Sequence, residues 1–369
     1  GFAASAEGGY APHVIGFNLE TIYFGVHVGL DSVRDVLEAA RQQADENNDT
    51  VLVNLGGRDF ELHPRGVKFF RYRLTCSDFT LLVANPFRKD KEGNQRKCIF
   101  KLQPPVYIEL SAAFTWREGY LNAALSVLKW VECVFGEIER TVLSRVDVTV
   151  DVEGLEFEGS DIERFITRAR HWTGYTKKEG ATIEYWGRKT SGFGLGGGAL
   201  MCRIYDKTRE VTCHVTKRWF RPLWRRQGWD GKKKIWRIEF QVRREMLRER
   251  GMNDVELSLK SVQSLYEYLV RDWLTLRDRN PNNKKRRDWA VSKSWELLWN
   301  IKFQSFGDID LGSDQREANA DHLGKSAIGF IKSYAKAARL TFAQACDILK
   351  QQILALPELK IQMAKRGTR

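Results

Sequence analysis

The chain has 369 residues, of which 43% are hydrophobic and 29% charged, and its formal net charge is +13. This length allows one large or two ordinary domains with a full core, and the composition is that of a folded rather than a disordered chain. A strongly basic chain with 12 Trp, 11 Tyr and 20 Phe favours a nucleic acid as its partner.

Several other classes are excluded by what the sequence lacks. No apolar run approaches the roughly 18 residues of a membrane span, and no basic amphipathic helix indicates a membrane surface. The first residues lack a signal-peptide pattern, and the six cysteines and six histidines are scattered without Cys-x-x-Cys or His-x-His spacing. We therefore expect a cytoplasmic protein without membrane contact, disulfides, a zinc site or a histidine-cluster metal site.

Hydrophobic periodicity predicts a mostly β first third that ends in a long helix. A helix is expected over 31–44, a charged turn over 88–97 and the long helix over 116–139. Strands are expected over 17–28, 50–55, 67–75, 79–84, 98–102 and 106–110.

The remainder of the chain alternates strands with helices and then becomes helical. Strands are predicted over 143–152, 182–188, 199–207 and 235–243, with helices over 160–171 and 255–277. A glycine-rich turn, Ser191 to Gly198, is expected between the second and third of these strands. Helices follow over 289–301, 319–340 and 341–356, and Thr341 with Gln344 matches a capping box.

These elements predict an α+β fold, in which an antiparallel sheet with packed helices precedes an all-helical C-terminal region. We expect a flexible lead-in over 1–15, the α+β domain over 16–280 and a helical domain over 281–369. The basic segment 280–287 is interpreted as the linker between the last two.

The strand over 199–207 carries the first candidate site. Arg203, Tyr205 and Lys207 share one face of this strand, and Cys202, Ile204 and Asp206 share the other. A phenol between two cations suits attack on a phosphodiester, because the cations hold phosphate oxygens and favour the phenolate over the phenol. The alternative is a tyrosine in a half-buried sheet with two hydrated cations beside it.

Three carboxylates on the neighbouring predicted strands complete the candidate site. Asp147 and Asp151 share a face of one strand about 13 Å apart, which is too far for both to grip one ion on a straight strand. Glu239 lies on the polar face of another strand. If the strands are neighbours, these hard oxygen ligands predict Mg²⁺ or Mn²⁺ as cofactor. The alternative is an edge strand with a hydrated face.

A basic and aromatic segment over 217–237 contains nine basic residues, one acidic residue and four tryptophans. Basic side chains neutralise phosphates, and indole rings stack on unpaired bases. The alternative is a basic surface loop whose tryptophans belong to the core. The candidate DNA contacts are Arg188, Lys217, Arg218, Trp219, Arg221, Trp224, Arg225, Arg226, Trp229, Lys232, Lys233 and Lys234.

Over about residues 100–250 the chain resembles the replication initiation factor (Rep_trans) family. The resemblance is carried, in chain order, by Arg145-x-Asp-x-x-x-Asp151, Tyr185-Trp-Gly187, Arg203-Ile-Tyr-Asp-Lys207 and Trp236-Arg-x-Glu239. This family contains rolling-circle plasmid initiators, some phage initiators and conjugative relaxases.

The resemblance implies metal-dependent nicking and rejoining of one DNA strand at an origin, through a 5′-phosphotyrosine and a free 3′-OH. It makes Tyr205 the nucleophile with Arg203 beside it, and Asp147, Asp151 and Glu239 the acidic positions. Tyr185 is the second candidate nucleophile. It also implies a homodimer that works with a host helicase on plasmid DNA in a bacterial cytoplasm.

Other functions stay open at this point. A conjugative relaxase would share the chemistry, a non-catalytic sequence-specific DNA-binding protein would use the acids structurally, and an RNA-binding protein is a third possibility. No phosphate-binding Gly-Lys-Ser/Thr sequence is present, so no nucleotide cofactor is expected. Gly192-x-Gly194-x-x-Gly197 precedes a predicted strand instead of a helix, which argues against a dinucleotide site and favours a mobile hairpin tip.

Overall fold

The computed structural model describes residues 11–89, 95–97, 100–169, 181–186, 189–304 and most of 328–355. By its contacts the chain divides into two compact units. The first contains Gly1–Glu210 and Leu223–Leu311, and the second contains Val211–Pro222 and Gly312–Arg369. Within the described residues, no helix has the length and apolar character needed to cross a bilayer.

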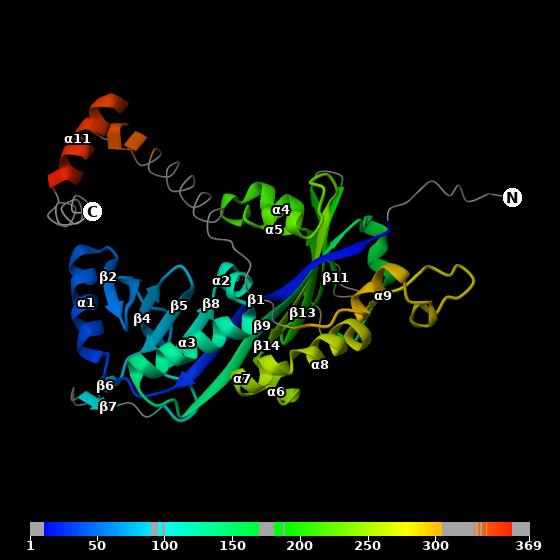
Figure 1. Cartoon of the computed structure of the whole chain (residues 1–369), viewed down its shortest axis with the longest axis horizontal. Helices are drawn as coiled ribbons and strands as arrows, with labels where there is room; N and C mark the ends of the chain where they lie inside the picture. The colour runs from blue at the N-terminus through cyan, green and yellow to red at the C-terminus, as the bar shows by residue number, and fades with distance from the viewer. Residues whose placement is uncertain are drawn as a thin grey trace. The chain divides into compact units, whose positions relative to one another are not determined.

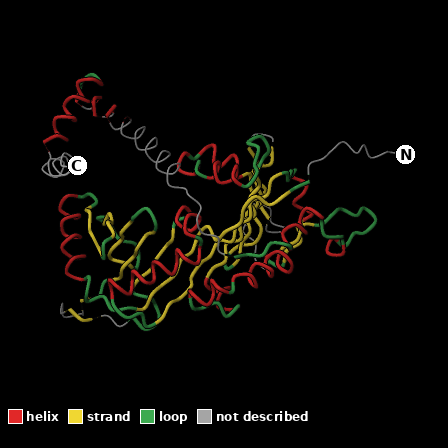
Figure 2. The backbone as a smooth tube through the Cα atoms, viewed as in Figure 1, coloured by secondary structure: helices red, strands yellow, loops and turns green. Residues whose placement is uncertain are grey.

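The first unit is built on a sheet whose eleven strands run in the order β11-β12-β13-β14-β9-β1-β8-β5-β4-β3-β2. Figure 2 draws the strands in yellow. Every neighbouring pair is antiparallel. One half contains β1 (His13–His27), β8 (Val106–Leu110), β5 (Phe79–Ala84), β4 (Phe70–Thr75), β3 (Arg58–Leu62) and β2 (Val51–Leu55). The other contains β9 (Arg140–Glu153), β14 (Ile235–Arg243), β13 (Leu200–Asp206), β12 (Lys189–Gly197) and β11 (Ala181–Trp186).

Helices cover the apolar face of this sheet because alternate residues of its strands are apolar. On β9, Val146, Val148 and Val150 are fully buried, while the residues between them carry the carboxylates. The helices on the apolar side are α3 (Tyr120–Phe135), α6 (Arg244–Glu249), α7 (Val255–Lys260) and α8 (Val262–Glu267), whereas α2 (Ala112–Glu118) lies on the other side (Figure 1). The α+β architecture with an antiparallel sheet is therefore confirmed.

The remaining elements are short. They are α1 (Arg34–Asn47), α4 (Lys207–Cys213), α5 (Phe220–Arg226), α9 (Lys293–Trp299), a π-helix (Tyr268–Trp273), and the 3₁₀ turns Gly159–Arg164, Val215–Lys217 and Arg286–Asp288. Two small strand pairs join β10 (Phe165–Thr167) to β15 (Leu274–Leu276) and β6 (Phe87–Lys89) to β7 (Gln95–Lys97).

The glycine-rich stretch was expected to be a turn and is instead strand β12, so that prediction is wrong. β12 lies between β11 and β13, where Gly192 faces Tyr205 and Gly194 faces Arg203. A Cβ added to Gly192 would lie 3.2 Å from the Tyr205 Cβ and 3.1 Å from the Ile204 carbonyl oxygen. Glycine is needed here for close approach between strands, not for a loop.

Two of the helix predictions are also corrected. The helix expected over 116–139 is divided at Gly119, whose φ of 76° favours glycine, into α2 and α3. The helix expected over 160–171 is a 3₁₀ turn followed by β10, which pairs with β15 at the end of the predicted 255–277 helix. Pairing between distant segments overrides local helical periodicity in both β10 and β15.

Smaller differences concern edges and turns. β3 lies in a stretch for which no strand was predicted, and the charged turn over 88–97 contains the β6–β7 pair. Residues 100–102 form no strand, and the other two residues of the predicted 98–102 strand lie outside the described residues. Most of the expected lead-in also lies outside them, but its last residues form the start of β1, which pairs from His13 with Glu153.

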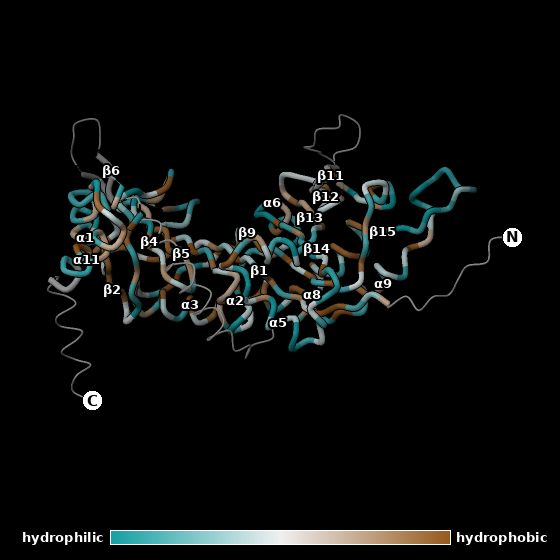
Figure 3. The backbone as a smooth tube through the Cα atoms, turned by 90° about the horizontal axis from the view of Figure 1, so that it is seen from above, coloured by the Kyte–Doolittle hydropathy of each residue, from teal (hydrophilic) through white to brown (hydrophobic). Residues whose placement is uncertain are grey.

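The contacts within the chain do not divide it into units at residue 281, where the domain boundary was expected. The Trp295 indole N–H donates to the Val270 carbonyl oxygen at 2.9 Å, and the Phe303 ring lies 5.1 Å from that of Tyr266, so residues after 281 pack on the first unit. The basic loop that precedes them is a hydrophilic excursion between β15 and α9 (Figure 3). Because buried apolar residues of the first unit flank this loop on both sides, it is a surface loop and not a linker between two domains.

The described part of the C-terminal region is helical, as predicted. Helix α11 spans Phe342–Ala355 in the second unit. Its predicted capping box is present, because Thr341 N–H donates to Gln344 Oε1 at 2.9 Å and Gln344 N–H donates to Thr341 Oγ1 at 3.3 Å. Most of the helix predicted over 319–340 lies outside the described residues.

Candidate active site

The three strands predicted to carry the site are neighbours, in the order β13-β14-β9. Their register places Tyr205 opposite Arg237 and Arg237 opposite Asp151. In the adjacent row, Arg203 is opposite Glu239, which is opposite Thr149 of β9. We call the sheet face that carries Tyr205 and Glu239 the polar face.

Tyr205 lies between a carboxylate and an ammonium group. Its hydroxyl donates to Glu239 Oε2 at 2.9 Å and accepts from Lys207 Nζ at 3.3 Å. Arg203 is ion-paired with the other oxygen of Glu239, and 45% of the Arg203 side chain is exposed. Lys207 begins α4 instead of continuing the strand, but its side chain still reaches the phenol. The residues predicted to lie beside Tyr205 are therefore close to it. Lys207 is hydrogen-bonded to its hydroxyl, and Arg203 is ion-paired with the same Glu239.

The surroundings of Tyr205 do not favour the phenolate, so that expectation is wrong. Burial raises the pKa of Tyr205 well above its ordinary value of 10, and the charges of Glu239 and Glu210 raise it further. Burial alone would also raise the pKa of Glu239, but Arg203, Arg237 and Lys207 outweigh it and hold that pKa below its usual value. The stable arrangement is a protonated phenol that donates to an ionised carboxylate.

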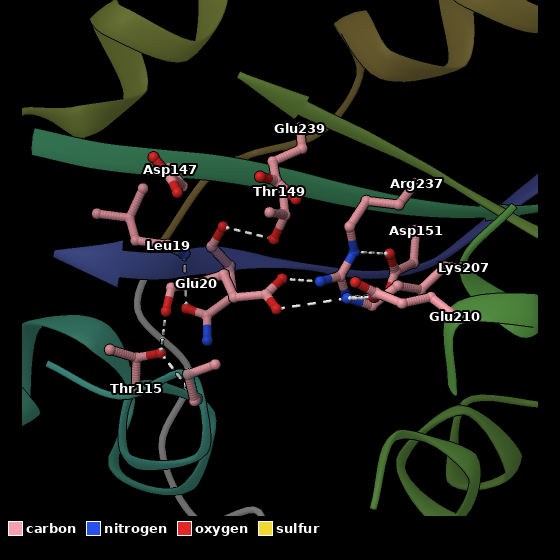
Figure 4. Close-up of polar contacts among 12 residues, drawn as sticks. Leu19, Glu20, Thr115, Asp147, Thr149, Asp151, Lys207, Glu210, Arg237 and Glu239 are labelled. Atoms are coloured by element: carbon pink, nitrogen blue, oxygen red, sulfur yellow. Dashed lines mark hydrogen bonds and ion pairs between the residues drawn. The ribbon is translucent and has the colours of Figure 1, made fainter. Parts of the chain in front are cut away.

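Lys207 also belongs to a network of buried charged side chains (Figure 4). Arg237 Nε and Nη2 donate to the two oxygens of Asp151 at 2.6 and 2.8 Å, and Arg237 is also ion-paired with Glu20. Lys207 Nζ lies 3.4 Å from Glu20 Oε1 and 2.5 Å from Glu210 Oε2. The side chains of Arg237 and Lys207 are fully buried. Mutual pairing compensates for the loss of water that each charge suffers there.

Desolvation acts against both partners of the central pair. Burial raises the pKa of Asp151 to about 7, with the charge of Lys207 opposing the shift. Burial likewise lowers the pKa of Arg237 to about 9, opposed by Glu239. Trp224 of α5 adds a hydrogen bond from its indole N–H to Asp151 Oδ2 at 2.9 Å. Asp151 of β9 therefore links Arg237 of β14 to Trp224 of α5.

Sequence reasoning missed Glu20 and Glu210. Glu20 lies at an irregularity of β1, where the register with β9 shifts between Leu19 and Thr21. Such bulges redirect a side chain, and here the carboxylate points into the network (Figure 4). A glutamate between Leu19 and Ile22 of a predicted strand was an available signal. Glu210 gave none, because its role depends on α4 beginning at Lys207.

The predicted metal ligands are engaged with other groups. Arg145 Nε and Nη2 donate to both oxygens of Asp147 at 2.8 and 2.6 Å, while Asp151 is taken by Arg237 and Glu239 by Arg203 and Tyr205. Across the described ranges, no three His, Cys, Asp or Glu side chains are grouped so that they could hold a metal ion. The carboxylates form ion pairs in this arrangement, which does not fit a metal cage.

The basic segment separates into buried rings and exposed cations. The Trp229 indole N–H donates to the Lys233 carbonyl oxygen at 2.9 Å, and the Trp219 ring stacks on Phe220 with centroids 3.9 Å apart. Trp219, Trp224 and Trp229 are all buried, so the prediction that they stack on bases is corrected in favour of a packing role. The exposed cations are Arg218, Arg225, Arg226, Lys232 and Lys234, and Lys217, Arg221 and Lys233 are half-buried.

Two predicted residues cannot be placed. Arg188 and the side chain of Tyr185 lie outside the described residues. The backbone of Tyr185 belongs to β11, where it pairs with Thr190, two strands away from Tyr205.

Comparison with known proteins finds likeness in structure alone. No protein-family model and no curated protein matches the chain. The fold is similar to that of a rolling circle replication initiator protein from Geobacillus stearothermophilus, with a TM-score of 0.40 and 13% sequence identity over 83% of this chain and 97% of that chain. The function proposed below rests on the side-chain geometry of this chain alone.

Proposed function

We propose that this protein initiates rolling-circle replication by nicking and rejoining one DNA strand, with Tyr205 as the nucleophile. The observation that carries the proposal is the position of the Tyr205 hydroxyl, which is hydrogen-bonded to Glu239 and Lys207 and lies next to the exposed guanidinium of Arg203. A conjugative relaxase would use the same chemistry at a transfer origin.

In this mechanism Glu239 acts as the general base. It takes the phenol proton over the 2.9 Å hydrogen bond as the Tyr205 oxygen attacks phosphorus. The new bond joins that oxygen to phosphorus, the bond from phosphorus to the 3′ oxygen breaks, and a proton returned to the 3′ oxygen yields a free 3′-OH. The phosphotyrosine retains the energy of the broken phosphodiester, so the reverse attack rejoins the strand.

Two cations offset the charge that develops during attack. Arg203 is accessible to non-bridging phosphate oxygens, which suit its planar donors. Lys207 is buried behind the phenol and stabilises negative charge on its oxygen. The exposed cations of the basic segment would neutralise phosphates of the flanking DNA. Mg²⁺ or Mn²⁺ dependence is kept as a separate hypothesis, and no step above depends on it.

The test is an adduct assay on supercoiled DNA that carries the cognate origin, or on a library of hairpin oligonucleotides if the origin is unknown. We expect a covalent protein–DNA adduct on a denaturing gel that is lost in Tyr205→Phe. It should be retained in Tyr268→Phe, a matched loss of one hydroxyl from a tyrosine outside the sheet. Parallel reactions with Mn²⁺ and with EDTA test the metal requirement. An adduct that survives in Tyr205→Phe but not in Tyr185→Phe would move the nucleophile to β11.

A second candidate is a non-catalytic, sequence-specific DNA-binding protein. It is favoured by the raised pKa of Tyr205, which burial and Glu239 cause, and by the engagement of Asp147, Asp151 and Glu239 in ion pairs. Tight binding to a verified cognate origin, with no adduct under any metal condition, would support this candidate against the first.

A further inference from the structure

Five aromatic rings form a continuous strip on the other half of the sheet. Successive ring centroids lie 6.2 Å apart from Tyr23 to Tyr107, 5.8 Å from Tyr107 to Phe70, 5.1 Å from Phe70 to Phe69 and 6.3 Å from Phe69 to Phe100. We call these five residues the aromatic strip. They come from β1, β8, β4 and the segments that precede β4 and β8, and β5 lies between β8 and β4 in the sheet (Figure 1).

The aromatic strip lies on the polar face. Tyr23 of β1 is opposite Arg145 of β9, and Arg145 precedes Asp147 by two residues, so the three side chains share one face. On the other side Tyr23 is opposite Glu109 of β8, two residues from Tyr107. The aromatic strip and the candidate active site thus lie on the same face of the sheet, with the buried side chains of Asp147 and Gln241 between them.

The exposure of these rings distinguishes them from core aromatics. Phe24, Phe60 and Phe79, elsewhere in the same half of the first unit, are at most 1% exposed. All five rings of the aromatic strip are only partly buried. Most neighbouring rings meet edge to face, at interplanar angles of 69°, 88° and 81°, so unpaired bases would stack on single rings or insert between them.

Cations border the strip. The Arg145 guanidinium lies 5.1 Å from the centroid of the Tyr23 ring. Arg73 is exposed near Glu109, whose pKa burial raises and Arg73 lowers. Lys68 and Lys101, which adjoin Phe69 and Phe100 in the chain, are also exposed. Exposed rings bordered by cations suit an unpaired strand, whose bases can stack while its phosphates are neutralised.

We propose that the aromatic strip binds single-stranded DNA by stacking of unpaired bases, on the same face of the sheet as Tyr205. Duplex DNA would not fit, because its bases are stacked on one another and present only their edges in the grooves. The inference extends the proposed function to a separate surface, and it concerns binding alone.

Binding is measured with the full chain carrying Tyr205→Phe, so that cleavage cannot contribute and a failure of the proposed function does not affect the result. Fluorescence anisotropy would follow a labelled oligothymidylate of about twelve nucleotides and a duplex of the same length. We expect Phe70→Leu and Tyr107→Leu each to raise the Kd for the single strand about tenfold, with the duplex Kd unchanged. Tyr268→Leu, which removes a half-buried ring outside the sheet, should change neither.

A second measurement needs no substitution in the strip. An oligonucleotide containing iodo-deoxyuridine is photocrosslinked to the same protein, and the attached peptides are identified by mass spectrometry. Crosslinks at Tyr23, Phe70 or Tyr107 support the proposal. Crosslinks confined to other surfaces, equal weakening of duplex and single-strand binding, or unchanged DNA affinity with an altered sedimentation coefficient would overturn it, the last in favour of a protein partner.

Discussion

Two charge-rich regions of this chain have opposite surroundings. In the buried network, Asp151, Lys207 and Arg237 are fully buried, and the contacts that hold them are to groups of opposite charge or to hydrogen-bond donors. In the basic segment, cations such as Arg225 and Lys232 are exposed to water. Charge in the first region fixes geometry and is costly to alter. Charge in the second contributes little to the fold and is available to phosphates.

The largest expected effect removes the centre of the buried network. Arg237→Met should lower the free energy of unfolding by about 3–5 kcal/mol, because Asp151 and Glu20 lose the guanidinium that compensates their burial. Urea denaturation measures this change. As a control, Lys260→Met breaks an exposed pair with Glu256 and should cost at most about 1 kcal/mol. Similar destabilisation in the two variants would remove the distinction between buried and exposed charge.

The next effect concerns the rate and pH dependence of nicking. The pKa of Glu239 is lowered by Arg203 and other cations despite burial, and that of Tyr205 is raised by burial and by Glu239. Between about pH 6 and about pH 9, Glu239 therefore stays ionised and Tyr205 stays protonated. Neither group of the reacting pair titrates within this range, so we expect any change of the single-turnover rate across it to follow the buried network, where burial raises the pKa of Asp151 to about 7.

Replacing the base sharpens this test. Glu239→Gln should slow adduct formation by about 10²–10⁴-fold. The remaining rate should rise about tenfold per pH unit, because the phenolate must then form by loss of its proton to solvent and burial still raises the Tyr205 pKa. Arg243→Gln, at an exposed position at the end of the same strand, is the matched control. A flat profile in Glu239→Gln would exclude Glu239 as the base.

The smallest expected effect belongs to the basic segment. Arg225→Ala with Lys232→Ala should leave the urea midpoint unchanged and weaken duplex binding without regard to sequence. The slope of log K against log salt should fall in magnitude by about 0.9 for each phosphate that these cations no longer neutralise. Anisotropy titrations at several salt concentrations measure it. Destabilisation comparable to that of Arg237→Met would show that these cations also hold the fold together.

The sequence was sufficient for the parts of the molecule in which local pattern and final position agree. Period-two alternation located β9, β13 and β14, and it placed Tyr205, Arg203 and Glu239 on polar faces before their neighbours were known. The capping box at Thr341 was readable for the same reason, since both partners lie within one turn of helix.

Tertiary structure decided everything that depends on distant partners. Whether the Trp224 ring stacks on bases or packs depends on Asp151, which is 73 residues away in the chain. Whether Tyr205 is a phenol or a phenolate depends on its burial and on the carboxylate of Glu239. Glu239 Oε2 lies 2.9 Å from the Tyr205 hydroxyl, nearer than Lys207 Nζ at 3.3 Å. Glu20 entered the network only through a change of register between β1 and β9. Burial and pairing set the charge state of a side chain, and the sequence determines only which charges the fold has available.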